Sequence, residues 1–111
     1  MLETGYKFGE VHVLAPQVEA AADKVQFKNV FGNANGGVSV LAFKAGQMLT
    51  EHLAPAEVMV YVVEGEVEFT MIDTPHSLRK GEFMLMGEGV PHSVLAKADS
   101  KVMLVKVKSD K

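Results

Sequence analysis

The sequence predicts an all-β fold, an antiparallel sandwich or barrel with little helix. Apolar segments of about four to eight residues recur along most of the chain, and turn residues separate them at spacings of about 8–12 residues. Only residues 16–23, PQVEAAAD, have the composition of a helix, and a helix of about two turns is marginal by itself. We therefore expect about eight to ten short strands.

The size of the chain favours one domain. It has 111 residues, of which 48% are apolar, enough for a packed core. We expect a single domain over residues 1–111, with an N-terminal arm over about 1–24 and a barrel core over about 25–108. Within the arm, residues 11–14 are expected to form a short strand.

Composition excludes several classes of function. The chain has no cysteine, so disulfides, thiolate catalysis and zinc–sulfur sites are absent. The net charge is −3 and the basic residues are scattered, so we expect no nucleic-acid partner. No apolar run reaches the roughly 18 residues of a membrane helix, so we expect no membrane partner and a cytoplasmic location. The lysines over 97–111 are interpreted as a solvated face.

The first strand signal is a hairpin over residues 25–43. Residues 25–31, VQFKNVF, alternate with the period of a strand. GNANGG, over 32–37, supplies residues that tolerate positive φ, and VSVLAF, over 38–43, follows as the return strand. This pattern is a strong hairpin signal.

The second half of the chain continues the strand pattern. Residues 58–63, VMVYVV, are apolar on both faces, so we expect both faces to be covered. Residues 64–72 alternate as a half-buried antiparallel strand does. Further strands are expected over 83–86, 92–96 and 101–108, with turns or loops at 73–75, 80–81 and 87–89. One small barrel cannot hide this much apolar surface, so we expect a homodimer, formed sheet to sheet or by exchanged N-terminal strands.

Two segments repeat the order of glycine, histidine and strand-forming sequence. They are GQMLTEHLAPAEVMVYVVEG, over 46–65, and GEFMLMGEGVPHSVLA, over 81–96. They resemble the two motifs of the cupin superfamily, over about residues 38–107, and the chain looks most like the small single-domain cupins, a group largely without assigned activity. The matching positions are Gly46, His52 and Gly65 in the first motif and Gly81, Gly89, Pro91 and His92 in the second.

The resemblance implies a cupin-type jelly-roll β-barrel, or double-stranded β-helix, with antiparallel strands. It also implies that His52 and His92 line one cavity. In cupins with intact motifs, three histidines and a glutamate hold a divalent metal. In this sequence Ala54 and Val58 stand at two of these four positions, so the metal ligands that remain are His52 and His92.

Two imidazoles bind a divalent metal only loosely, so the chemistry depends on a third ligand. Glu57 is nearest in the sequence, but it points away from His52 unless a bulge at 54–56 shifts the alternation. His76 shares a face with Leu78, which we expect to point inward. An exposed carboxylate and a surface turn histidine are the alternatives for Glu57 and His76. The cofactor is then one divalent transition metal (Zn, Ni, Fe, Mn or Cu) or none.

Three functions are compatible with these residues. The first is a small-molecule-binding cupin of unassigned activity, whose cavity uses His52 and His92 as polar anchors, with or without a weakly bound divalent metal. The second is a metal-dependent cupin enzyme, an oxygenase or isomerase acting on a small polar substrate. The third is an interaction module whose function lies in the dimer. Ala54 and Val58 favour the first, and the sequence leaves open whether the protein is catalytic.

Overall fold

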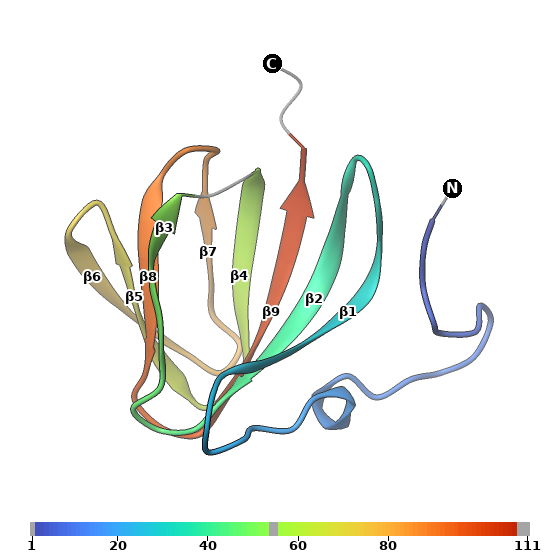
Figure 1. Ribbon diagram of the computed structural model, residues 1–111, viewed down its shortest axis with the longest axis horizontal. Helices are drawn as coiled ribbons and strands as arrows, with labels where there is room; N and C mark the ends of the chain where they lie inside the picture. Colours follow the sequence, from blue (N-terminus) through green and yellow to red (C-terminus); the bar gives the residue numbers. More distant parts are fainter. Residues whose placement is uncertain (1, 54–55, 109–111) are drawn as a thin grey trace.

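The chain folds into two antiparallel sheets that face each other as a jelly-roll barrel (Figure 1). The structure, a computed structural model, describes residues 2–53 and 56–108. For residues 51–53 it describes the backbone but not the side chains. One sheet has the strand order β1-β2-β9-β4-β7 and the other β3-β8-β5-β6. The described part contains a single three-residue 3-10 turn, η1, over Ala15–Gln17 and no longer helix. The predicted all-β fold is therefore confirmed.

The strands follow the turn pattern of the sequence. Their bounds are β1 Gln26–Asn33, β2 Gly36–Phe43, β3 Met48–Leu53, β4 Glu57–Glu64, β5 Glu66–Met71, β6 Thr74–Arg79, β7 Phe83–Met86, β8 Pro91–Ala96 and β9 Ser100–Val107. The predicted hairpin over 25–43 is confirmed, because β1 and β2 pair antiparallel through the GNANGG turn region. The strand β3 was not predicted, because its polar residues and its irregular pairing hide the period of a strand.

The arm differs from the prediction. No strand forms over 11–14, and the expected helix over 16–23 is reduced to η1. The arm instead packs as an irregular segment, because Val18 is buried against Val40 and Ala42 on the outer face of β2. Near its start, Glu3 and Gly32 exchange backbone hydrogen bonds, which adds the arm to the edge of β1 of the same chain.

The connection between β5 and β6 is tighter than predicted. Ile72 and Asp73 both have positive φ, 49° and 60°, and they form a two-residue hairpin loop. The predicted turn at 73–75 is therefore wrong by one to two residues, and Pro75 lies within β6, a strand that was not predicted. β6 is an edge strand, where a residue without an N–H is tolerated.

The core lies between the two sheets. Its fully buried side chains come from both of them, and include Phe43, Val60 and Val62 on one side and Val67 and Phe69 on the other. Along β4 the buried residues alternate with half-buried ones, so the inner face is covered and the outer face is not fully covered by the chain itself. The expected covering of residues 58–63 on both faces is therefore met on the inner face, and the outer face is only partly covered by this chain.

None of the helices in the described part of the chain is long and apolar enough to span a bilayer.

Candidate functional site

A cavity of about 230 Å³ lies between the sheets. Met86, His92 and Lys106 of its wall belong to the end of the barrel where β7 runs into β8 and β9 ends, and Figure 1 shows this end of the strands. Both sheets contribute to its wall, which is apolar except for His92 and Lys106. The lining residues are Leu41, Leu49, Val58, Val60, Phe69, Met86, His92, Val94, Val102, Leu104 and Lys106. A concave apolar site with a few converging polar groups is the usual form of a small-molecule site.

His92 is a buried polar group of this cavity, with 6% of its surface exposed. It lies on β8, where it alternates with the buried Val94 and Ala96, so the strand period turns it inward. Its Nδ1 lies 3.1 Å from the Val90 carbonyl oxygen. A carbonyl can only accept, so this hydrogen bond requires the proton on Nδ1, and in the neutral ring Nε2 then carries the lone pair. Its ring also stacks on Phe69, with centroids 5.7 Å apart and planes 8° from parallel.

The two motif segments meet as neighbouring strands, and His52 of β3 is the register partner of His92 of β8. The pairing shifts between Leu49 and His52, because three steps along β3 correspond to two steps along β8. A bulge of this kind adds one residue to one strand. Without it, Glu51 and not His52 would stand opposite His92. The side chain of His52 lies outside the described residues.

The other candidate ligands lie away from the cavity wall. Glu57 is exposed at the start of β4, and its carboxylate accepts a hydrogen bond from the Glu88 backbone N–H at 3.2 Å. His76 is half-buried and shares the face of β6 with the buried Leu78, as predicted. His76 is the register partner of Phe69, but it is not among the residues that line the cavity. Ala54, at the second histidine position, lies outside the described residues.

The described residues do not fit a catalytic metal centre of three protein ligands. They contain no cluster of three or more His, Cys, Asp or Glu side chains that could hold a metal ion. At the carboxylate position the wall has Val58, which is buried and lines the cavity. Of the two metal ligands expected from the sequence, the described cavity wall contains His92.

Sequence reasoning missed Lys106, and the solvated face predicted for 97–111 is wrong at two positions. Lys106 is half-buried and lines the cavity. The Lys101 side chain is 13% exposed, and its Nζ donates to the Ala15 carbonyl at 2.6 Å. The sequence does indicate that Lys106 points inward, because side chains alternate along a strand and Lys106 shares the face of β9 with Val102 and Leu104.

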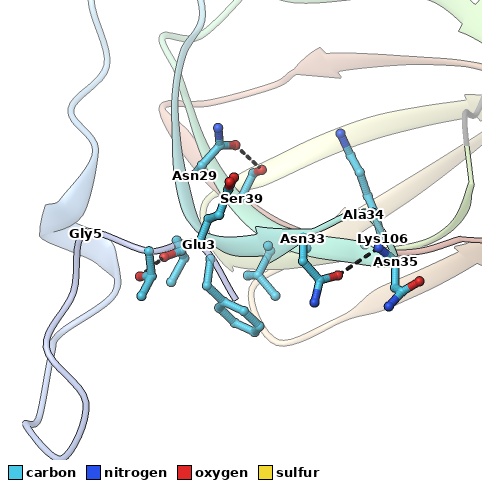
Figure 2. A pocket seen from close by; sticks show the side chains of 15 residues that line it. Glu3, Gly5, Asn29, Asn33, Ala34, Asn35, Ser39 and Lys106 are labelled. Atoms are coloured by element: carbon cyan, nitrogen blue, oxygen red, sulfur yellow. Dashed lines mark hydrogen bonds between the residues drawn. The ribbon is translucent and has the colours of Figure 1, made fainter. Parts of the chain in front are cut away.

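A second hollow of about 830 Å³ lies beside the hairpin of β1 and β2 and is bordered by the arm (Figure 2). Its wall is mostly backbone and small polar side chains, two of which, Asn29 and Ser39, are joined by a hydrogen bond of 2.9 Å. Glu3 and Lys106 are its two charged lining residues. It is larger than the barrel cavity, but it lacks the apolar wall and the buried histidine that make the cavity the better candidate.

The comparisons with known proteins agree with this geometry. The cupin domain family model matches residues 39–108. A curated relative, the SchB protein of Streptomyces halstedii, is 33% identical over 75 residues, which are 67% of this chain and 54% of that protein. This chain therefore spans about half the length of that relative.

Solved structures resemble the whole barrel. An RmlC-like cupin from Desulfovibrio desulfuricans is 28% identical with a TM-score of 0.79, covering 88% of this chain and 95% of that one. A conserved protein of unknown function from Streptococcus pyogenes is 24% identical with a TM-score of 0.86, covering 96% and 93% of the two chains. At 24% identity, the second likeness shows the fold alone.

Proposed function

This chain belongs to the cupin family, and from that premise we propose that its barrel cavity binds a small molecule, with His52 and His92 as polar anchors. The observation that carries the proposal is the pairing of these two residues across β3 and β8 beside a cavity whose described wall is apolar except for His92 and Lys106. Directly opposed residues of antiparallel strands lie on the same face of the sheet. The inward orientation of His92 supports its own position at the cavity, and we assign His52 to the same site from its motif position and its register with His92.

The cavity suits a small ligand. Its volume of about 230 Å³ is below the range of about 300–1,000 Å³ of sites for drug-sized molecules. Aliphatic residues and Phe69 offer the ligand an apolar surface, while His92 offers a hydrogen-bonding group held in place by Val90 and Phe69. A polar group that is already fixed lowers the ordering cost of binding.

A methyl-resolved NMR titration with benzyl alcohol and benzoate tests this binding. We expect shifts at the methyl groups of Val58, Val60 and Leu104, which line the cavity, and none at Val11, which is 97% exposed. Shifts confined to residues outside the cavity, or no shifts with either compound, would contradict the proposal.

The alternative is a metal-dependent enzyme, an oxygenase or isomerase of a small polar substrate. The pairing of His52 with His92 favours a metal, and Val58 at the carboxylate position opposes it. We therefore propose at most weak binding of a divalent transition metal.

Metal analysis of protein purified without an affinity tag separates the two functions. Our proposal expects less than stoichiometric Zn, Ni, Fe, Mn and Cu in the wild-type protein. Stoichiometric metal that is lost in the His52→Ala, His92→Ala double variant, and kept in a His12→Ala control, would instead support the enzyme. His12 is an exposed residue of the arm.

We further propose that the protein is a homodimer, joined through the outer face of the five-stranded sheet. On this face Phe83, Leu85 and Val107 are 55%, 65% and 58% exposed. Met59 lies between Leu85 and Val105, its register partners on the two neighbouring strands. A second copy presenting the same patch would cover these side chains through an isologous contact. Contiguous apolar patches are uncommon on monomers, which supports this assignment.

A further inference from the structure

We propose that the barrel cavity is a receptor for an anion, and that Lys106 supplies its positive charge. The ligand is then a small apolar molecule that carries a carboxylate. This inference rests on the proposed function of the cavity and narrows it to one chemical class.

The strand geometry of β9 turns Lys106 into the cavity wall. Val102, Leu104 and Lys106 alternate along β9, and all three line the cavity. Lys106 also lines the hollow beside the hairpin, and Figure 2 shows its side chain extending away from Asn33 and Asn35 at the hairpin tip. Its ammonium group is therefore carried by a stem that belongs to the wall of the cavity.

The neighbours of Lys106 leave its charge uncompensated. Its register partners are Gly37 of β2 and Val58 of β4, and neither has a polar side chain. Lys106 forms no ion pair with any carboxylate in the described part of the chain. Lys101, on the opposite face of the same strand, pairs with Glu19 and Glu64. Lys106 is thus the cation of β9 that is left for a ligand.

The wall selects an anion over a cation. None of the described lining residues is acidic, so a carboxylate entering the cavity meets no like charge. A carboxylate accepts from the three N–H donors of an ammonium group, and the low dielectric of an apolar site strengthens the attraction. In intact cupin motifs a carboxylate stands at the position of Val58. Here a divalent cation beside Val58 would instead be repelled by the positive charge of Lys106, the register partner of Val58.

The experiment measures binding of benzoate, benzyl alcohol and benzylamine by calorimetry, with methyl NMR to locate them. The wild-type protein and the Lys106→Arg variant should bind benzoate in the cavity, at least about tenfold more tightly than benzyl alcohol. The Lys106→Met variant should lose at least about tenfold in benzoate affinity. Benzylamine should not bind there, because its charge repels Lys106.

The matched control is Lys108→Met, which makes the same change of net charge at an exposed residue beyond β9. Its benzoate affinity should equal that of the wild type, and thermal unfolding of each variant checks its fold. If Lys106→Met binds benzoate as tightly as the wild type, the anion assignment is wrong. If benzyl alcohol and benzoate then shift the cavity methyl groups equally, the small-molecule function stands without the charge. If neither shifts them, both proposals fail.

Discussion

At the scale of single residues, the backbone conformation explains why glycine stands at motif positions. Gly65, which ends the first motif, has φ of 86° between β4 and β5. A Cβ there would overlap the Ser100 hydroxyl and the Asp99 carbonyl. The Ser100 hydroxyl donates to the Glu66 carbonyl at 3.0 Å and accepts from the Glu66 N–H at 3.0 Å, so it cannot move without breaking this junction. Gly65 therefore serves the fold and not the ligand site.

The variant Gly65→Ala should be strongly destabilised, while Gly46→Ala should be only moderately destabilised. Both residues have positive φ, but a Cβ on Gly46 meets no atom within 4 Å. We expect a loss of about 1–2 kcal/mol in the free energy of unfolding for Gly46→Ala, from the left-handed backbone alone. Steric overlap should add at least about 1–2 kcal/mol for Gly65→Ala. Urea unfolding measures both, and equal losses would contradict the steric argument.

At the scale of the elements, the turn residues allowed β4, β5, β7, β8 and β9 to be predicted, while β6 was missed because a turn was expected at 73–75. Irregular backbone limited the rest. The pairing of His52 with His92 depends on a bulge between Leu49 and His52. A bulge changes the parity of a strand without a mark in the sequence, so alternation could not place it. The inward position of Lys106 could have been predicted, because it follows Val102 and Leu104 on one face of β9. The many lysines over residues 97–111 suggested a solvated face instead.

The arm illustrates a similar limit. Its alanine-rich segment suggested a helix by intrinsic propensity, but tertiary packing decides the outcome for so short a segment. Val18, which is 7% exposed, packs on Val40 and Ala42 and holds the arm on the outer face of β2. Lys101 adds a hydrogen bond to the Ala15 carbonyl. These contacts join residues far apart in the chain, and no local pattern reveals them.

The variant Val18→Ala should lower the free energy of unfolding by about 1.5–2.5 kcal/mol, since it removes buried methyl groups and leaves a space. The control Val11→Ala changes a residue that is 97% exposed and should have almost no effect. Chemical denaturation followed by circular dichroism measures both. If Val18→Ala and Val11→Ala unfold at the same denaturant concentration, the arm does not stabilise the barrel.

At the scale of the whole molecule, two surfaces of the five-stranded sheet have different roles. The inner face closes the cavity, and the arm covers part of the outer face through Val18. The rest of the outer face remains apolar and exposed around Leu85 and Val107. The sequence predicted this surplus of apolar surface from strands that are apolar on both faces. In the proposed dimer, the same surface of a second copy covers this exposed apolar face.

The variant Leu85→Glu should shift the protein from dimer to monomer in sedimentation velocity at micromolar concentration. A carboxylate buried in an apolar interface without a partner is strongly unfavourable. The control is Ile72→Glu, at a residue that is 64% exposed, as Leu85 is 65% exposed, but that lies in the β5–β6 loop. It should remain dimeric. A wild-type protein that sediments as a monomer would contradict the dimer.

The most direct test of the cavity as the binding site is the affinity for benzoate of His92→Phe, compared with His12→Phe. Phenylalanine preserves the ring that stacks on Phe69 and removes the hydrogen-bonding nitrogens. His12 is a surface residue, so its substitution should leave the affinity unchanged. We predict that His92→Phe stays folded and binds benzoate at least about tenfold more weakly than the wild type. Equal affinity of the two variants would contradict a ligand site anchored by His92.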